Sequence, residues 1–253
     1  MKTFYKILLL ILFSVGAVAG VLVFAKTQVA PPMNIDPVDQ YVEDLKSDCD
    51  SYEGSNDYQE SQSEYVRLDN KLKRFIAEDV ITSETSDEYR HQIDEIYGKD
   101  LCRYGFRFFQ RNEWPDKDIK ELSERIAALR ADKLSTGETA VTGEFITQSD
   151  NINNIIAKYS DARQLARNTS FTSVDNSRSK INRADEFTSD DYLKNNRSLV
   201  ADLNSLRGKL ARSHYNYVAS KVNQLAGKHY LSEDEFLSLL QNVNVVIDEY
   251  KNT

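Results

Sequence analysis

Nineteen consecutive residues without a charged side chain, Ile7 to Ala25, stand between Lys6 and Lys26. As an α-helix this run would be roughly 28 Å long, which matches the hydrocarbon thickness of a membrane. The sequence therefore predicts an N-terminal transmembrane or signal helix over residues 1–26, either retained as an anchor or cleaved as a signal peptide. We favour the anchor, because the run stays hydrophobic to its end.

The flanking charges predict the orientation of this segment. Lys2 and Lys6 precede the run, whereas only Lys26 follows it closely. The positive-inside bias then leaves the N-terminus in the cytoplasm and exports residues 27–253. We expect a membrane-anchored protein whose C-terminal part is extracytoplasmic (periplasmic in a bacterium), or a secreted one if the segment is cleaved.

The exported part is acidic and poor in helix-breaking residues. Without the three lysines above it has 29 basic and 40 acidic residues, a net charge of −11. This charge argues against nucleic acid and anionic lipid as main partners, because both need a basic face. The whole chain has only 9 Gly and 4 Pro, which favours helices over a β-sandwich or a disordered chain.

Apolar residues after residue 36 recur mainly at spacings of three and four, which is typical of amphipathic helices. The expected fold is all-α: an elongated antiparallel bundle of about six to eight helices behind the N-terminal segment. We predict a tether over 27–36, a helical bundle over 37–168, a polar linker over 169–188 and a C-terminal long-helix hairpin over 189–253. This hairpin could also pack on the first bundle as one domain.

The C-terminal hairpin has the clearest local signals. We expect its first helix to begin after Ser189 and to run to Gly227, with a buried leucine seam. The seam residues are Leu199, Leu203, Leu206 and Leu210. Ser232 and Glu235 form a capping box, which predicts the start of the last helix.

Only two cysteines occur, Cys49 and Cys102. In an exported protein two cysteines suggest one disulfide, which here would staple the first predicted helix to the third. The alternative is a pair of buried free thiols. We expect the disulfide.

The most unusual local composition lies between Arg103 and Trp114. Arg103, Arg107 and Arg111 are spaced by four, which places them in one stripe on a helix. Together with Trp114 they are the candidate binding residues, with arginines that grip acidic groups and aromatic rings that stack on sugars. The alternative is an aromatic core set with arginine stems along its edge.

No nucleophile elbow, phosphate-binding loop or zinc motif occurs. Glu88 and His91 have the spacing of a di-iron ligand pair, but no second pair exists, and a solvated helix face explains them better. We therefore predict no catalytic residues, no cofactor and no metal.

The expected function is a non-enzymatic extracytoplasmic helical scaffold or protein-interaction module tethered to the membrane through residues 7–25. Such a module would bind a protein partner or a second copy of itself. The alternative is a helical domain that binds cell-envelope glycan or a small anion. An enzyme with an unrecognised carboxylate site is the least favoured hypothesis.

Overall fold

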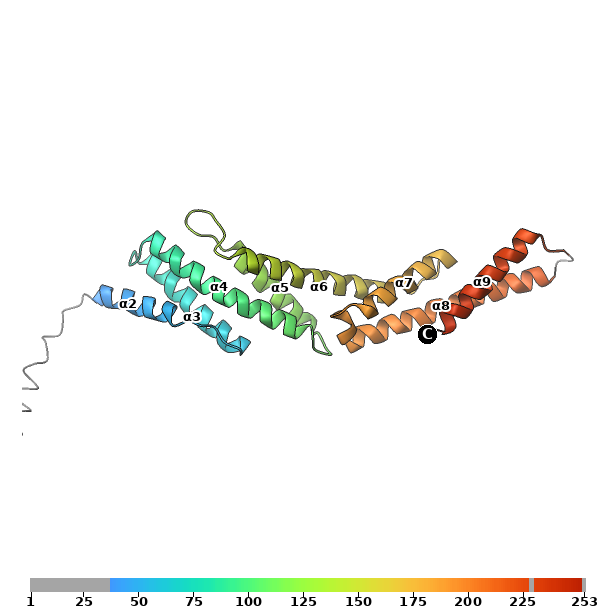
Figure 1. Cartoon of the computed structure of the whole chain (residues 1–253), viewed down its shortest axis with the longest axis horizontal. Helices are drawn as coiled ribbons and strands as arrows, with labels where there is room; N and C mark the ends of the chain where they lie inside the picture. Colours follow the sequence, from blue (N-terminus) through green and yellow to red (C-terminus); the bar gives the residue numbers. More distant parts are fainter. Residues whose placement is uncertain (1–36, 228–229, 252–253) are drawn as a thin grey trace, which may run out of the picture.

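A computed structural model describes residues 37–227 and 230–251, and these residues form eight α-helices and one short 3-10 helix (Figure 1). The helices are α2 (Pro37–Asp50), α3 (Tyr58–Ala77), α4 (Ser83–Phe108), α5 (Asp116–Ala131), α6 (Gly143–Arg167), α7 (Val174–Ser189), η1 (Leu193–Asn195), α8 (Arg197–Ala226) and α9 (Glu233–Lys251). In this part of the chain an isolated bridge between Lys133 and Thr139 is the sole β-type pairing. The prediction of an all-α chain with six to eight helices is confirmed.

The predicted membrane segment, residues 7–25, and the tether, residues 27–36, lie outside the described residues. None of the described helices α2 to α9 has both the length and the apolar content that a membrane crossing requires.

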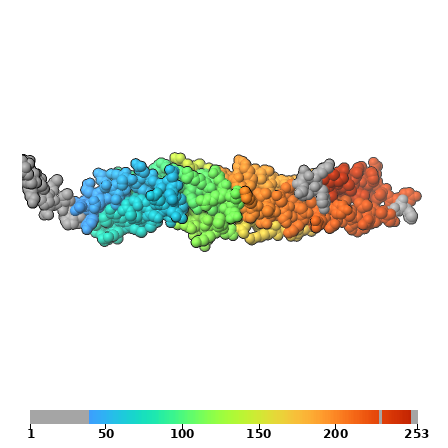
Figure 2. Space-filling model, turned by 90° about the horizontal axis from the view of Figure 1, so that it is seen from below, coloured from blue at the N-terminus to red at the C-terminus, as the bar shows by residue number. Residues whose placement is uncertain are grey.

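Groups of helices that lie side by side follow one another along a single long axis, so that the molecule is a rod (Figure 1; Figure 2). Helices α2, α3 and α4 lie at one end, α5 and α6 cover the middle, and α8 and α9 form the other end. One hydrophobic cluster joins α2, α3 and α4, and a larger one joins α4, α5, α6 and the start of α8. A third, small cluster lies between α7 and α8. The core is therefore a series of clusters along the rod.

Glycines on α4 allow α6 to approach it closely. A Cβ atom added at Gly98 would lie 2.8 Å from Cδ2 of Phe145, and one at Gly105 would lie 2.7 Å from Cδ1 of Ile152. Both distances are shorter than carbon atoms tolerate without movement. The two glycines therefore mark a close helix crossing.

The long C-terminal helix is shorter than predicted. It begins at Arg197, where the Asn196 side chain accepts a hydrogen bond from the backbone N–H of Leu199 at 3.0 Å. Ser189 instead ends α7, and the Asp190 carboxylate turns the chain by accepting the N–H groups of Tyr192 and Leu193. The predicted start after Ser189 is therefore wrong, and Asn196 is the N-cap of α8.

The leucine seam of α8 is buried, and its residues pack in two different parts of the core. Leu199 and Leu203 join the central cluster, while Leu206 and Leu210 pack with Ile181 of α7. Helix α7 lies within the segment that the sequence suggested as a polar linker, and it contacts both α6 and α8. Helix α9 packs beside the C-terminal part of α8 (Figure 1).

The predicted disulfide is wrong, since both cysteines are free and buried. Cys49 belongs to the cluster of α2, α3 and α4, and its carbonyl accepts a hydrogen bond from Gln92 of α4 at 3.0 Å. Cys102 belongs to the central cluster. Ten residues of helix, roughly 15 Å, separate Gln92 from Cys102, whereas a disulfide needs Cα atoms within about 7 Å. The alternative of two buried thiols is therefore the correct one.

Candidate functional site

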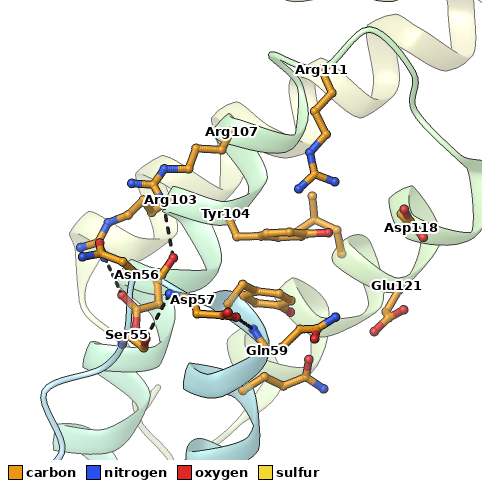
Figure 3. A pocket seen from close by; sticks show the side chains of 14 residues that line it. Ser55, Asn56, Asp57, Gln59, Arg103, Tyr104, Arg107, Arg111, Asp118 and Glu121 are labelled. Atoms are coloured by element: carbon orange, nitrogen blue, oxygen red, sulfur yellow. Dashed lines mark hydrogen bonds and ion pairs between the residues drawn. The ribbon is translucent and has the colours of Figure 1, made fainter.

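A pocket of about 560 Å³ opens where the C-terminal half of α4 meets the beginning of α3 and the first turns of α5 (Figure 3). The loop before α3 supplies Ser55 and Asn56 to one side, and α5 supplies Asp118 and Glu121 to another. The lining is mostly polar. The volume of the pocket is within the usual size range of small-molecule sites.

Three of the four predicted binding residues line this pocket: Arg103, Arg107 and Arg111. Their spacing of four on α4 places them on one face of the helix, as expected. Arg103 donates a hydrogen bond to Oδ1 of Asp100 at 3.0 Å, and it also reaches Oδ1 of Asn56 at 3.4 Å. Arg107 reaches the carbonyl oxygen of Asn56 at 3.4 Å. Two guanidinium groups therefore meet at Asn56.

Asp100 is the buried anchor of this arrangement. Its carboxylate accepts hydrogen bonds from the Ser55 N–H at 2.9 Å and the Ser61 hydroxyl at 2.7 Å, in addition to Arg103. Gly54 has a positive φ of 75°, and a Cβ atom there would collide with the Asp100 carboxylate. The loop before α3 can therefore close on α4 only because residue 54 is a glycine.

Arg111 belongs to a column of stacked groups. Its guanidinium carbon lies 5.7 Å from the ring centroid of Tyr104, and the opposite face of this ring stacks on Tyr58 with centroids 3.9 Å apart. Arg125 in turn lies over the Tyr58 ring, at 5.9 Å from its centroid. Burial raises the pKa of both tyrosines, so the phenols stay protonated at neutral pH. The column leaves little ring face for a sugar to stack on.

The α5 side of the pocket is acidic. Figure 3 shows Asp118 and Glu121 across the Tyr104 ring from Arg103 and Arg107. Glu121 already pairs with Arg125 at 2.6 Å. Among the described residues, Arg107, Arg111 and Asp118 form no ion pair. The pocket therefore has two solvent-exposed cations on α4 and one half-buried anion on α5 that form no ion pair within the described structure.

Trp114 does not line the pocket. It is buried in the central cluster, where it contacts Phe109 edge to face at a centroid distance of 4.8 Å and lies 5.2 Å from Tyr159. Its indole N–H donates to the backbone carbonyl of Arg111 at 2.9 Å. For this residue the core interpretation is the correct one, since its polar atom is satisfied inside the turn after α4.

His91 lies on an exposed part of α4, and its Nδ1 is 2.6 Å from the carbonyl oxygen of Ala140. Across the described part of the chain, no group of three or more His, Cys, Asp or Glu residues is placed to hold a metal ion.

The sequence did not indicate Asn56, Tyr58 and Asp118 as site residues. Asn56 lies in a loop, Tyr58 begins a helix and Asp118 is an acid in the first turn of another helix, and only tertiary packing brings the three together.

Comparison with family models, with curated proteins and with solved structures finds no match to this chain.

Proposed function

We propose that this chain is a non-enzymatic helical scaffold or protein-interaction module, which its N-terminal apolar segment tethers to the outer face of a membrane. An exposed apolar stripe on α9 supports this role. Phe236, Leu240 and Ile247 are 53%, 47% and 46% exposed. At 100° per residue the three side chains point within about 40° of one another, so they form one continuous stripe.

The stripe is exposed because, among the described helices, α9 has a single main neighbour, α8. Val246 is buried and Val243 is half-buried at this contact, on the side of α9 next to the stripe. An apolar arc wider than about 100° is typical of a helix that packs on more than one neighbour. A contiguous apolar surface of this kind marks an interaction site more often than scattered apolar residues do.

The test compares two double variants of the full-length chain. Leu240→Ser with Ile247→Ser changes the stripe, and Val66→Ser with Ile76→Ser changes two similarly exposed residues of α3, at 45% and 40%. In native membranes the wild type should form crosslinked adducts with a second copy or with another protein. We expect the α9 variant to lose these adducts and the α3 variant to keep them. Identical crosslinking patterns in both variants would contradict the role of the stripe.

The membrane tether has its own test. Alkaline phosphatase fused after Thr253 should be active, because the lysines before the apolar run predict an exported C-terminus. An inactive phosphatase, together with an active cytoplasmic reporter at the same position, would overturn the topology.

A second candidate function is ligand binding in the arginine pocket. Arg107 and Arg111 support it, since both guanidinium groups line the pocket, are solvent-exposed and form no ion pair within the described structure, so they are free to bind a ligand anion. The covered tyrosine faces favour a small anion over a glycan. A thermal-shift titration with inorganic phosphate and with glucuronate should raise the melting temperature of the wild type, and Arg107→Gln with Arg111→Gln should abolish the effect. Equal shifts in both proteins would rule out the pocket.

A further inference from the structure

The formal charges around the pocket are of both signs. Its lining residues carry three positive charges, on Arg103, Arg107 and Arg111, and four negative ones. The negative charges belong to Asp57, Asp100, Asp118 and Glu121. A polyanion would therefore meet about as much repulsion as attraction. A ligand with charges of both signs would suit the lining better.

Most of these charges are already satisfied within the protein. Asp100 pairs with Arg103, Glu121 pairs with Arg125, and Asp57 caps the N-terminus of α3 by accepting the N–H groups of Gln59 and Glu60. Within the described structure, the other charged lining residues, Arg107, Arg111 and Asp118, form no ion pair. The two arginines lie on α4 and the aspartate lies on α5, so the unused charges are separated across the pocket (Figure 3).

We propose that the pocket binds a small zwitterion, in which a carboxylate meets Arg107 or Arg111 and an ammonium group meets Asp118. This inference rests on the second candidate function, ligand binding in the same pocket, and specifies its ligand class. The Tyr104 ring edge lies between the two charged sides and provides an apolar surface for a hydrocarbon spacer. A free ω-amino acid and a C-terminal lysine of a peptide both have this chemistry.

The first experiment measures the binding of three matched probes to the wild-type chain by isothermal titration calorimetry. The zwitterion is 6-aminohexanoate, and hexanoate and hexylamine each lack one of its charges. Because a hydrogen bond to a charged group contributes about 1.5–3 kcal/mol, the zwitterion should bind at least about tenfold more tightly than either control. A series from glycine to 8-aminooctanoate finds the spacer length that fits.

Substitutions then show which side chains bind the carboxylate and the ammonium group of the ligand. Asp118→Asn should weaken 6-aminohexanoate binding about tenfold and leave hexanoate binding unchanged, whereas Arg107→Gln with Arg111→Gln should weaken both. The control variants are Asp175→Asn and Arg178→Gln, which change the same charges on the exposed surface of α7 and should change neither affinity.

A third set of probes separates the two sources of the ligand. Nα-acetyl-lysine imitates a C-terminal lysine, and its amide lacks the carboxylate. Tighter binding of Nα-acetyl-lysine than of 6-aminohexanoate would indicate a peptide end, and the reverse would indicate a free amino acid.

The outcomes also distinguish failure of the zwitterion proposal from failure of the ligand-binding function on which it rests. If every amino acid of the series binds no more tightly than its matched carboxylate, the zwitterion proposal is wrong while anion binding stands. If phosphate, glucuronate and the whole series all fail to bind, both proposals fall.

Discussion

Tyr58 and Tyr104 stack face to face, with ring centroids 3.9 Å apart and ring planes 13° from parallel. One ring comes from the first turn of α3 and the other from the C-terminal half of α4. Arg111 lies over one end of this pair and Arg125 over the other. The stack thus holds α3 against α4 and also positions Arg111, an arginine of the pocket.

A double-mutant cycle should detect this stack. Tyr58→Leu and Tyr104→Leu should each destabilise the chain, and their effects should be coupled by about 0.5–1.5 kcal/mol, the usual value for an aromatic pair. Urea unfolding of the two single variants and the double variant gives the coupling energy. Tyr41→Leu combined with Tyr104→Leu is the control, since Tyr41 is exposed and their effects should add. Additive effects at Tyr58 and Tyr104 would contradict a stabilising stack.

Two neighbouring arginines of the pocket should differ in their effect on stability. Arg103→Ala leaves the buried Asp100 carboxylate without its cation, so we expect a loss of about 1–3 kcal/mol. Arg107→Ala removes only a 3.4 Å contact with a carbonyl group and should change stability by less than about 0.5 kcal/mol. Chemical denaturation compares them, and equal losses would refute the distinction.

The sequence predicted well the features that depend on residues close together in the chain. The Ser232 and Glu235 side chains accept each other's backbone N–H groups at 3.2 and 3.1 Å, as a capping box requires. The common face of the three arginines follows from local geometry in the same way. The fold class follows because such local signals repeat along the whole chain.

The sequence could not predict which residues meet across helices. Cys49 and Cys102 were correctly placed on helices, but periodicity does not reveal that they enter different core clusters. The acidic side of the pocket was missed because Asp118 resembles an ordinary first-turn acid, and only the packing of α5 beside α4 gives it another environment.

The leucine seam of α8 should tolerate no charge. Leu206 is buried with Leu210 and Ile181, so Leu206→Asp should cost several kcal/mol through an unpaired buried carboxylate. Leu240→Asp is the matched control on the exposed stripe of α9 and should cost no more than about 1 kcal/mol. Thermal unfolding gives both values. A Leu206→Asp protein that melts like the wild type would mean that the seam assignment is wrong.

Asp94 should make stability depend on pH. It is fully buried, one oxygen accepts a hydrogen bond from the Tyr65 hydroxyl at 2.8 Å, and within the described structure the other has no hydrogen-bond partner. Burial raises its pKa to about 7, and Asp132 and Asp69 add to the rise while Arg90 opposes it. The stability that the neutral acid provides is therefore complete below the unfolded pKa of about 4 and is lost as the pH rises to about 7.

Asp94→Asn removes this titration. Between about pH 4 and pH 7.5, the unfolding free energy of the wild type should fall by about 2–4 kcal/mol relative to that of the variant. Urea unfolding at several pH values measures the difference, with the exposed Asp175→Asn as control. Parallel pH profiles for the wild type and Asp94→Asn would show that Asp94 titrates normally.

The close crossing of α4 and α6 gives the last prediction. Gly98→Ala would raise the helix propensity of α4 by about 1 kcal/mol, yet its new Cβ would lie 2.8 Å from the rigid ring of Phe145. Because overpacking of a core costs about 1–3 kcal/mol, we expect a net loss of about 1–2 kcal/mol. Gly208→Ala on α8 is the control, since within the described structure no atom outside the adjacent turns of α8 lies within 4 Å of its new Cβ, and it should stabilise the chain by about 0.5–1 kcal/mol. Phe145→Leu should lessen the penalty of Gly98→Ala in the double variant, because it removes part of the obstructing ring. If both alanines stabilise the chain equally, α4 and α6 do not cross as closely as described.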